Sequence, residues 1–204
     1  MARSIKTKIQ LIQYFIDTRK FGSYLEIGVK DRRTFDNIKC KQKVGIDPIL
    51  NSNYEKDGVY LYRLDSDTFF KVNKRVFDIT FIDGLHLYEQ VMVDTINSWN
   101  CLNLKGVIVI HDCLPTNAIM SSRQRHSREW TGDVWKAIVW FKKSYPEIKC
   151  SVINIDYGCG VIIKSTPKIL AVPRGRKGYK DLDFNWLQSN LNLLDIREFK
   201  SDDF

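Results

Sequence analysis

Two pairs of acidic and imidazole side chains follow two apolar runs of the sequence. Asp83 and His86 come after one run, FDITFI, and His111 and Asp112 come directly after another, GVIVI. Carboxylates and imidazoles bind divalent cations, and imidazoles exchange protons near neutral pH. If the two runs are neighbouring strands, the four groups meet at one point. The pattern therefore predicts a functional site around Asp83, His86, His111 and Asp112, and a metal site in particular.

These residues also have ordinary structural interpretations. His86 is compatible with a hydrogen-bonded histidine at the start of a helix, and Asp112 with a helix-capping acid beside a structural imidazole. Ligands of open parallel sheets bind outside the carboxyl ends of the strands, and both pairs stand at such ends. Their position favours a functional role.

The apolar runs that position these groups are typical of buried strands. Seven strands are expected: Tyr24–Val29, Lys43–Asp47, Val59–Leu64, Phe77–Ile82, Gly106–Ile110, Lys149–Asp156 and Cys159–Ser165. Only Tyr157 and Gly158 separate the last two, so that pair must be antiparallel. The sequence predicts an α/β fold with a doubly wound seven-stranded sheet, mostly parallel with an antiparallel closing strand.

One domain is expected over residues 1–204, because no repeat, linker or second core interrupts the pattern. Residues 1–21 are predicted to form an amphipathic N-terminal helix, and residues 166–204 a basic tail that contains a short helix. Residues 113–132 form a long polar loop that leaves the candidate site. Loops of this length inside compact domains are usually functional, so this one is interpreted as a substrate lid.

Two further expectations concern a single acid and a helix start. Asp94, in the predicted helix Tyr88–Asn100, is interpreted as a surface residue. Thr131 or Asp133 is expected to cap the helix Asp133–Ser144.

The composition excludes several classes of protein. Hydrophobic residues make up 44% of the chain and charged residues 27%, which excludes disordered and collagen-like chains. No apolar run reaches the roughly 20 residues that span a bilayer, and no signal peptide is recognised. The five cysteines form no C-x-x-C pair. We expect reduced thiols and a cytoplasmic protein, with Cys113 the one cysteine near the site.

A glycine turn and a later acid suggest a nucleotide. Gly28 ends the first predicted strand, and Asp47 ends the second about 20 residues on. In nucleotide-binding α/β folds an acid at this place holds ribose hydroxyls. Ser66 or Asp67, after the third strand, could cap the following helix or face an adenine amino group, and the two roles are compatible.

The motifs LEIGV, VGIDP, FIDGLHLYEQV, IVIHDCLP and GDVWKAI follow one another across residues 24–138, and YGCGVIIK supplies the closing strand. In this order the chain resembles the class I S-adenosylmethionine-dependent methyltransferases. It is similar in particular to the family related to metal-dependent small-molecule and sugar O-methyltransferases. The resemblance implies S-adenosylmethionine as cofactor, Mg²⁺ or Mn²⁺ as metal, and methylation of a hydroxyl on a sugar or nucleotide sugar.

The matching positions imply roles for individual residues. The implied cofactor-binding residues are Glu26 and Gly28 at the methionine end, Asp47 at the ribose, Ser66 and Asp67 at the adenine, and Asp83. Asp83 and Asp112 match carboxylates that hold the cation, and Asp83 and His86 are the expected catalytic residues, His86 as general base. His111 stands where some relatives have a carboxylate, and the resemblance therefore makes it the third expected metal ligand. Residues 30–33 depart from the family, in which further Gly or Ser is common.

The implied partner is a small-molecule acceptor, anionic because Arg123, Arg125 and Arg128 lie in the predicted lid and guanidinium groups match phosphate geometry. A nucleic-acid methyltransferase is the first alternative. A net charge of +8 permits it, but no N/D-P-P-Y/F motif and no appended RNA-binding module accompany that charge. A non-catalytic S-adenosylmethionine-binding protein is the second alternative, and a homo-oligomer stays open.

Overall fold

The structure is a computed structural model that describes residues 5–172 and 178–201 of the 204-residue chain. Its strands are β1 (Ser23–Ile27), β2 (Gln42–Ile46), β3 (Tyr54–Lys56), β4 (Val59–Tyr62), β5 (Phe77–Ile82), β6 (Leu102–Ile110), β7 (Cys150–Ile153), β8 (Cys159–Ile163) and β9 (Ile196–Arg197). Its helices are α1 (Lys8–Arg19), α2 (Arg33–Asn37), α3 (Ser66–Val72), α4 (Tyr88–Asn100), α5 (Trp135–Ser144), α6 (Phe184–Ser189) and the 3₁₀ turn η1 (Leu191–Leu194). Parts of the predicted N-terminal helix and basic tail fall on residues 1–4, 173–177 and 202–204, outside the described residues.

The nine strands within residues 5–172 and 178–201 form one sheet, in the order β3-β4-β2-β1-β5-β6-β8-β7-β9. The doubly wound α/β prediction is confirmed, but the predicted count of seven strands is wrong. The two additional strands lie at the sheet edges: β3 pairs antiparallel with β4, and β9 pairs parallel with β7. All three residues of β3 are exposed and β9 has two residues, so neither produces an apolar run that the sequence could reveal.

The strand order places the carboxyl ends of the central strands at one edge. β1 pairs in parallel with β2 on one side and with β5 on the other, and β6 pairs in parallel with β5. The chain therefore leaves β1 in one direction to reach β2 and returns on the other side as β5. Such a reversal opens a crevice where ligands bind. The last pair is antiparallel as predicted, with β8 between β6 and β7.

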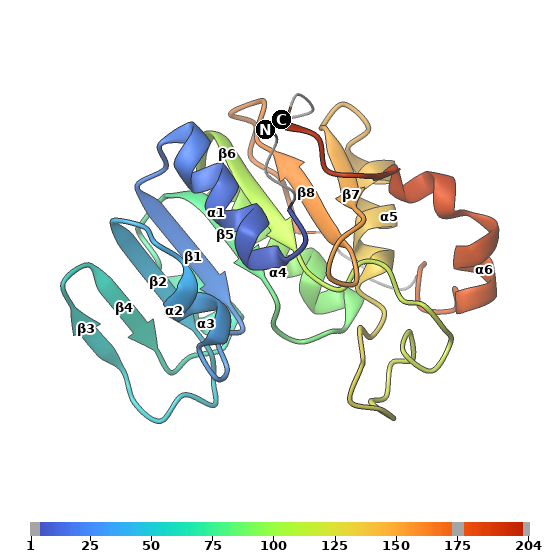
Figure 1. Cartoon of the computed structure of the whole chain (residues 1–204), viewed down its shortest axis with the longest axis horizontal. Helices are drawn as coiled ribbons and strands as arrows, with labels where there is room; N and C mark the ends of the chain where they lie inside the picture. The colour runs from blue at the N-terminus through green and yellow to red at the C-terminus, as the bar shows by residue number, and fades with distance from the viewer. Residues whose placement is uncertain (1–4, 173–177, 202–204) are drawn as a thin grey trace.

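Alternating residues of the strands build a core on each face of the sheet. In β6, Val107 and Val109 join the core beneath α1 and α2, whereas Ile108 and Ile110 join the core beneath α4 and α5. Burying each such side chain stabilises the fold by about 1.5–3 kcal/mol. Figure 1 shows α1 across one face of the sheet, with its N-terminal end near the ends of the central strands.

Helix starts differ from the predictions in an informative way. Asp65 caps α3, because its carboxylate accepts a hydrogen bond from Thr68 N at 2.7 Å, so neither Ser66 nor Asp67 is the cap. Val134 stands at the cap position of α5 and makes no side-chain cap. The carboxylate of Asp133 instead accepts a bond of 2.9 Å from Tyr88 N at the start of α4.

All five cysteines are free thiols, and Cys113 is fully buried with its Sγ 3.3 Å from Ile110 O. The packing explains Cys113 without a role in the site. Within residues 5–172 and 178–201, no helix has the length and apolar character needed to cross a membrane.

Candidate active site

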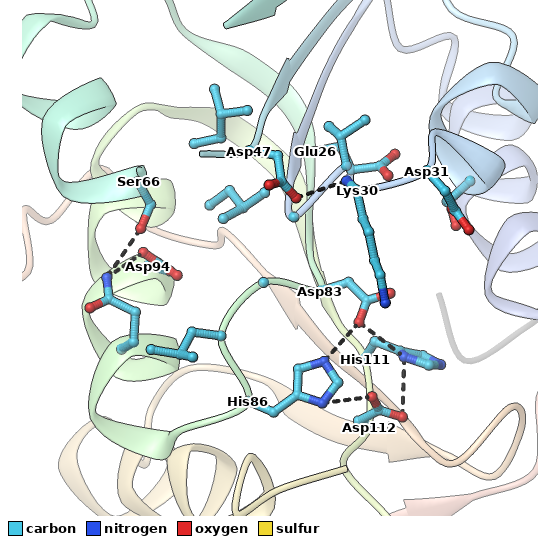
Figure 2. A pocket seen from close by; sticks show the side chains of 18 of the residues that line it. Glu26, Lys30, Asp31, Asp47, Ser66, Asp83, His86, Asp94, His111 and Asp112 are labelled. Carbon is cyan, nitrogen blue, oxygen red and sulfur yellow. Dashed lines mark hydrogen bonds and ion pairs between the residues drawn. The ribbon is translucent and has the colours of Figure 1, made fainter. Parts of the chain in front are cut away.

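The ends of the central strands open onto one cavity of about 950 Å³. Every predicted site residue lines this cavity: Glu26, Gly28, Asp47, Ser66, Asp67, Asp83, His86, His111 and Asp112. In the view of Figure 2, Ser66 and Asp94 gather at one end and the group of Asp83, His86, His111 and Asp112 at the other, with Asp47 between them. The convergence that the sequence predicts is therefore present.

Asp47 is held at the tip of β2 by two backbone donors. Its Oδ2 accepts a hydrogen bond from Lys30 N at 2.8 Å, and its Oδ1 accepts one from Ile49 N at 2.9 Å. Each carboxylate oxygen has a second lone pair. A buried acid that is oriented in this way can accept hydrogen bonds from both hydroxyls of a vicinal diol.

The packing of two strand ends requires a glycine at position 28. Its φ is +90°, and a Cβ built there would lie 2.2 Å from Asp83 O. The close approach is therefore to the tip of β5, which brings the ends of β1 and β5 together, and it leaves no room for a side chain. The turn continues with Lys30 and Arg32 at φ +45° and +65°. The left-handed conformation costs a residue with a Cβ about 1–2 kcal/mol, so this turn adopts the shape of a glycine-rich one at an energetic cost.

Glu26 lies on β1 with only 1% of its surface exposed. Burial raises its pKa to about 8, although the hydrogen bond of 2.5 Å that Tyr24 donates to its Oε2 lowers it. Glu26 can therefore carry a proton at neutral pH and present a neutral carboxyl to the cavity.

A polar cluster at the far end of the cavity includes a residue that the sequence misassigned. The Nε2 of Gln90 donates to Ser66 Oγ, Asp67 Oδ1 and Asp94 Oδ1, at 3.1, 3.1 and 3.0 Å. Asp94 is 1% exposed and lines the cavity, so its interpretation as a surface residue is wrong. The reason is that α4 is buried on nearly all sides, between the sheet, α3 and α5. The apolar residues on both sides of Asp94, in the stretch VMVDTI, could have indicated that it is buried.

The opposite end of the cavity holds two carboxylates and two imidazoles. His86 Nε2 lies 3.4 Å from Asp83 Oδ1, and His86 Nδ1 lies 3.4 Å from Asp112 Oδ2. His111 Nδ1 lies 3.3 Å from Asp83 Oδ1 and 3.2 Å from Asp112 Oδ1. Asp112 adopts φ +61°, a left-handed turn that aims its carboxylate back toward the end of β5.

The charges of this group shift its pKa values in opposite directions. Burial would raise the pKa of Asp83, but His111 and His86 lower it well below the ordinary value. Burial would lower the pKa of His86, but the nearby carboxylates of Asp83 and Asp112 raise it. The pKa of His111 is raised well above its ordinary value by the same two acids, again against the effect of burial. The two carboxylates therefore favour a positive charge beside them, on an imidazole or on a bound cation.

The loop of residues 113–132 closes over His86. The ring of Trp130 stacks on the imidazole at 5.0 Å, and His86 Nδ1 lies 3.0 Å from Trp130 O. A Cβ at Gly132 would lie 2.0 Å from His86 O, so only glycine fits where the loop passes. Trp130 is a site residue that the sequence gave no reason to select.

The three arginines of this loop differ in their surroundings. Arg123 donates to Asp133 Oδ2 at 2.5 Å and to both carboxylate oxygens of Glu89 at 3.1 Å. It therefore ties the loop to α4. Arg125 and Arg128 line the cavity.

Lys8 and Asp156, neither of which was predicted to be a site residue, also border the group of Asp83, His86, His111 and Asp112. The Nζ of Lys8, on α1, lies 2.9 Å from Asp83 Oδ2. Asp156, in the turn between β7 and β8, has its Oδ1 3.7 Å from His111 Nε2. Both residues are remote in sequence from the motifs at the strand ends, so no local pattern connects them to the site.

The donor chemistry of the group fits a divalent cation. One ligand atom from each of Asp83, His86 and Asp112 lies within 4.8 Å of the others. The ammonium of Lys8 lies beside Asp83, at 2.9 Å from its Oδ2. His111 is the predicted third ligand, and its Nδ1 lies between the same two carboxylates. Two acids and an imidazole suit Mg²⁺ or Mn²⁺.

Comparison with known proteins relates the chain to methyltransferase domains. Residues 17–113 match a family model described as a methyltransferase domain. Similar solved structures include the SAH-bound methyltransferase PaMTH1 of Podospora anserina (14% identity, 78% of this chain and 79% of that one, TM-score 0.57) and cofactor-bound Rv0187 from MTB (12%, 81% and 84%, 0.60). The O-methyltransferase of Bacillus cereus in complex with SAH is also similar (12%, 80% and 84%, 0.56). At identities this low the structural likeness establishes the fold alone. A search of curated proteins found no match.

Proposed function

We propose that the chain is a class I S-adenosylmethionine-dependent methyltransferase that methylates a hydroxyl group of a small acceptor of the sugar or nucleotide-sugar type. The match of residues 17–113 to a methyltransferase domain and the similar fold of SAH-bound methyltransferases support the first part of this proposal. The observation that carries the proposal is the position of His86. It stands with Asp83 and Asp112 at one end of a cavity whose other end offers polar groups suited to adenosine.

The cofactor would lie along the carboxyl ends of the strands. Its ribose hydroxyls would donate to Asp47, whose oxygens are oriented by Lys30 N and Ile49 N. Its adenine would face Ser66 and Asp67, which Gln90 holds in place. The methionine part would then reach the tip of β1, and the methyl group would face His86.

His86 would accept the proton of the acceptor hydroxyl. The oxygen would attack the methyl carbon, the bond between carbon and sulfur would break with its electron pair left on sulfur, and the products would be a methyl ether and S-adenosylhomocysteine. A donated bond from Nδ1 to Trp130 O would leave the lone pair of Nε2 free for the proton. Alignment of oxygen, carbon and sulfur would supply much of the acceleration.

We assign a cation to Asp83, Asp112 and His111, because His111 Nδ1 lies 3.3 Å from Asp83 Oδ1 and 3.2 Å from Asp112 Oδ1. His86 also has metal-ligand spacing to the two acids, but we assign it the proton, because one nitrogen cannot serve as ligand and base at once. A bound Mg²⁺ or Mn²⁺ would lower the pKa of the acceptor hydroxyl and offset the carboxylate charge that raises the pKa of His86. Asp83 and Asp112 would also orient the acceptor relative to His86.

The acceptor would enter beneath the loop of residues 113–132, acting as the lid. Trp130 and Tyr157 offer aromatic surface there, and Arg125 and Arg128 offer positive charge. Aromatic rings suit the apolar face of a sugar, and guanidinium groups suit its phosphate. An anionic sugar or nucleotide sugar therefore fits this end of the cavity best.

Methyl transfer from S-adenosylmethionine to a panel of sugars, sugar phosphates and nucleotide sugars, with Mg²⁺ and with a chelator, tests the proposal. The expected result is an O-methylated product, identified by mass spectrometry, whose formation depends on Mg²⁺ and His86. Methylation of RNA in place of these acceptors would contradict the proposal. So would cofactor binding without turnover on any acceptor, the behaviour of a non-catalytic binding protein.

A further inference from the structure

We propose that Lys8 is a resident cation of the active site and that its ammonium competes with a divalent metal ion for Asp83. This inference rests on the proposed metal-assisted function and adds a residue that controls metal occupancy. It predicts that the protein binds metal more weakly than its carboxylates alone would allow.

The contacts of Lys8 place its charge inside the reactive group. Its Nζ lies 2.9 Å from Asp83 Oδ2 and 3.4 Å from His111 Nδ1. The side chains of Lys8 and Asp83 are 21% and 19% exposed, so water screens their interaction only in part. These partners, Asp83 and His111, are two of the three residues assigned to the metal ion.

The position of this ammonium is imposed by the fold. Lys8 is the first residue of α1, and its backbone N–H donates to Asp156 Oδ2 at 3.1 Å. The helix is docked on the sheet through Leu11, Ile12 and Phe15, all fully buried. A lysine on this turn therefore reaches Asp83 because the helix is fixed there.

The charges around Lys8 explain why it stays in the site. Its ammonium, which is charged at neutral pH as in other lysines, pairs with the carboxylate of Asp83 at 2.9 Å. In the part of the chain that the structure describes, Lys8 is the lysine or arginine that pairs with Asp83 within 4.0 Å. A divalent ion at Asp83 would meet this like charge at close range and would have to displace it.

Mn²⁺ titration of the full chain by isothermal calorimetry, without cofactor, tests the inference. Lys8→Met keeps most of the apolar stem and removes the charge. Lys6→Met is the matched control, because Lys6 is exposed on the segment just before α1. We expect Lys8→Met to bind Mn²⁺ at least about tenfold more tightly than the wild type and Lys6→Met to match the wild type. Lys8→Arg, which keeps the charge, should also stay near the wild type.

The outcomes separate this inference from the proposed function. Tighter Mn²⁺ binding by Lys8→Met than by the wild type supports the inference. If the wild type binds no Mn²⁺ and Lys8→Met does, the inference is still supported. In that case Lys8 takes the place of the metal ion, and the metal-assisted part of the proposed function fails. Equal or weaker binding by Lys8→Met, with binding by the wild type intact, overturns the inference alone. Absence of binding in both overturns the inference and the metal site together. Melting curves check that each variant folds, and Lys8→Gln repeats the test if the Met variant does not.

Discussion

The Nε2 atom of His86 lies 3.4 Å from Asp83 Oδ1, across the turn that joins β5 to α4. The other nitrogen of the ring lies 3.0 Å from Trp130 O, and the Trp130 ring stacks on the imidazole. The imidazole is thereby fixed between a backbone oxygen and the acidic group. This arrangement underlies the role proposed for His86 as the proton acceptor.

Replacing His86 with glutamine should reduce kcat by a factor of about 10²–10⁴, the usual contribution of a general base. The affinity for S-adenosylhomocysteine should stay unchanged, because His86 stands at the acceptor end of the cavity. Single-turnover methyl transfer measures the first quantity and calorimetry the second. His126→Gln, in the exposed part of the same loop, is the control. Turnover of His86→Gln at the wild-type rate would exclude the base.

Asp47→Asn should weaken cofactor binding by about tenfold or more, because bonds to a charged acceptor contribute about 1.5–3 kcal/mol. Asparagine retains one acceptor oxygen for Lys30 N or Ile49 N, so the turn should persist. Calorimetric titration with S-adenosylhomocysteine gives the affinity, and thermal melting checks the fold. Asp57→Asn, an exposed acid between β3 and β4, should bind like the wild type. Equal affinity in both variants would remove Asp47 from the ribose site.

Gly28→Ala should destabilise the protein by at least about 2 kcal/mol, since its Cβ would lie 2.2 Å from Asp83 O in a backbone at φ +90°. Gly22→Ala is the matched control, because the nearest atom to its added Cβ lies at 3.9 Å. Urea unfolding of the two variants measures the difference. Equal stability of the two would mean that the tips of β1 and β5 are not packed as described.

Asp94 should make stability fall as the pH rises. Burial raises its pKa to about 7, from 3.8 in an exposed carboxyl. Between about pH 4 and 7 the folded protein therefore holds a proton that the unfolded chain has lost, and the free energy of unfolding decreases with rising pH by up to about 1.4 kcal/mol per unit. Glu26, with its pKa raised to about 8, acts in the same direction.

Asp94→Asn should flatten that dependence, because asparagine does not titrate. Urea unfolding at several pH values measures the slope, and Asp17→Asn, on the exposed side of α1, should leave the slope unchanged. An equally steep slope in Asp94→Asn would show that Asp94 does not hold the proton.

The lid arginines should separate into two classes. Arg128→Ala should raise KM for an anionic acceptor and leave the melting temperature unchanged, because Arg128 lines the cavity. Arg123→Ala should lower the melting temperature, because it leaves the buried Asp133 without its 2.5 Å partner. Steady-state kinetics and melting curves of both variants test the distinction. A large effect of Arg123→Ala on KM with no loss of stability would reverse the assignment.

Much of the fold was predictable because its strands are buried. The apolar runs FDITFI and GVIVI are each followed by an acid and an imidazole. Parallel pairing of β5 with β6 brings Asp83 and Asp112 together. The edge strands β3 and β9 were not predictable, because an exposed or two-residue strand has no apolar pattern.

The parts of the site that depend on packing were also out of reach of the sequence. Lys8 and Asp83 are 75 positions apart in the chain, and they meet only because α1 docks on the sheet. Trp130 stacks on His86 because the loop of residues 113–132 passes over that imidazole, and the sequence does not reveal the path of a loop. Asp94 is buried because helices surround α4, which a single-helix pattern does not reveal.

A crystal structure of the protein with S-adenosylhomocysteine tests the central claim most directly. The account predicts the ribose hydroxyls on Asp47, the adenine beside Ser66 and Asp67, and the sulfur atom facing His86 across a space that a hydroxyl can enter. A ligand bound outside this cavity, or a sulfur atom turned away from His86 and Asp83, would contradict it.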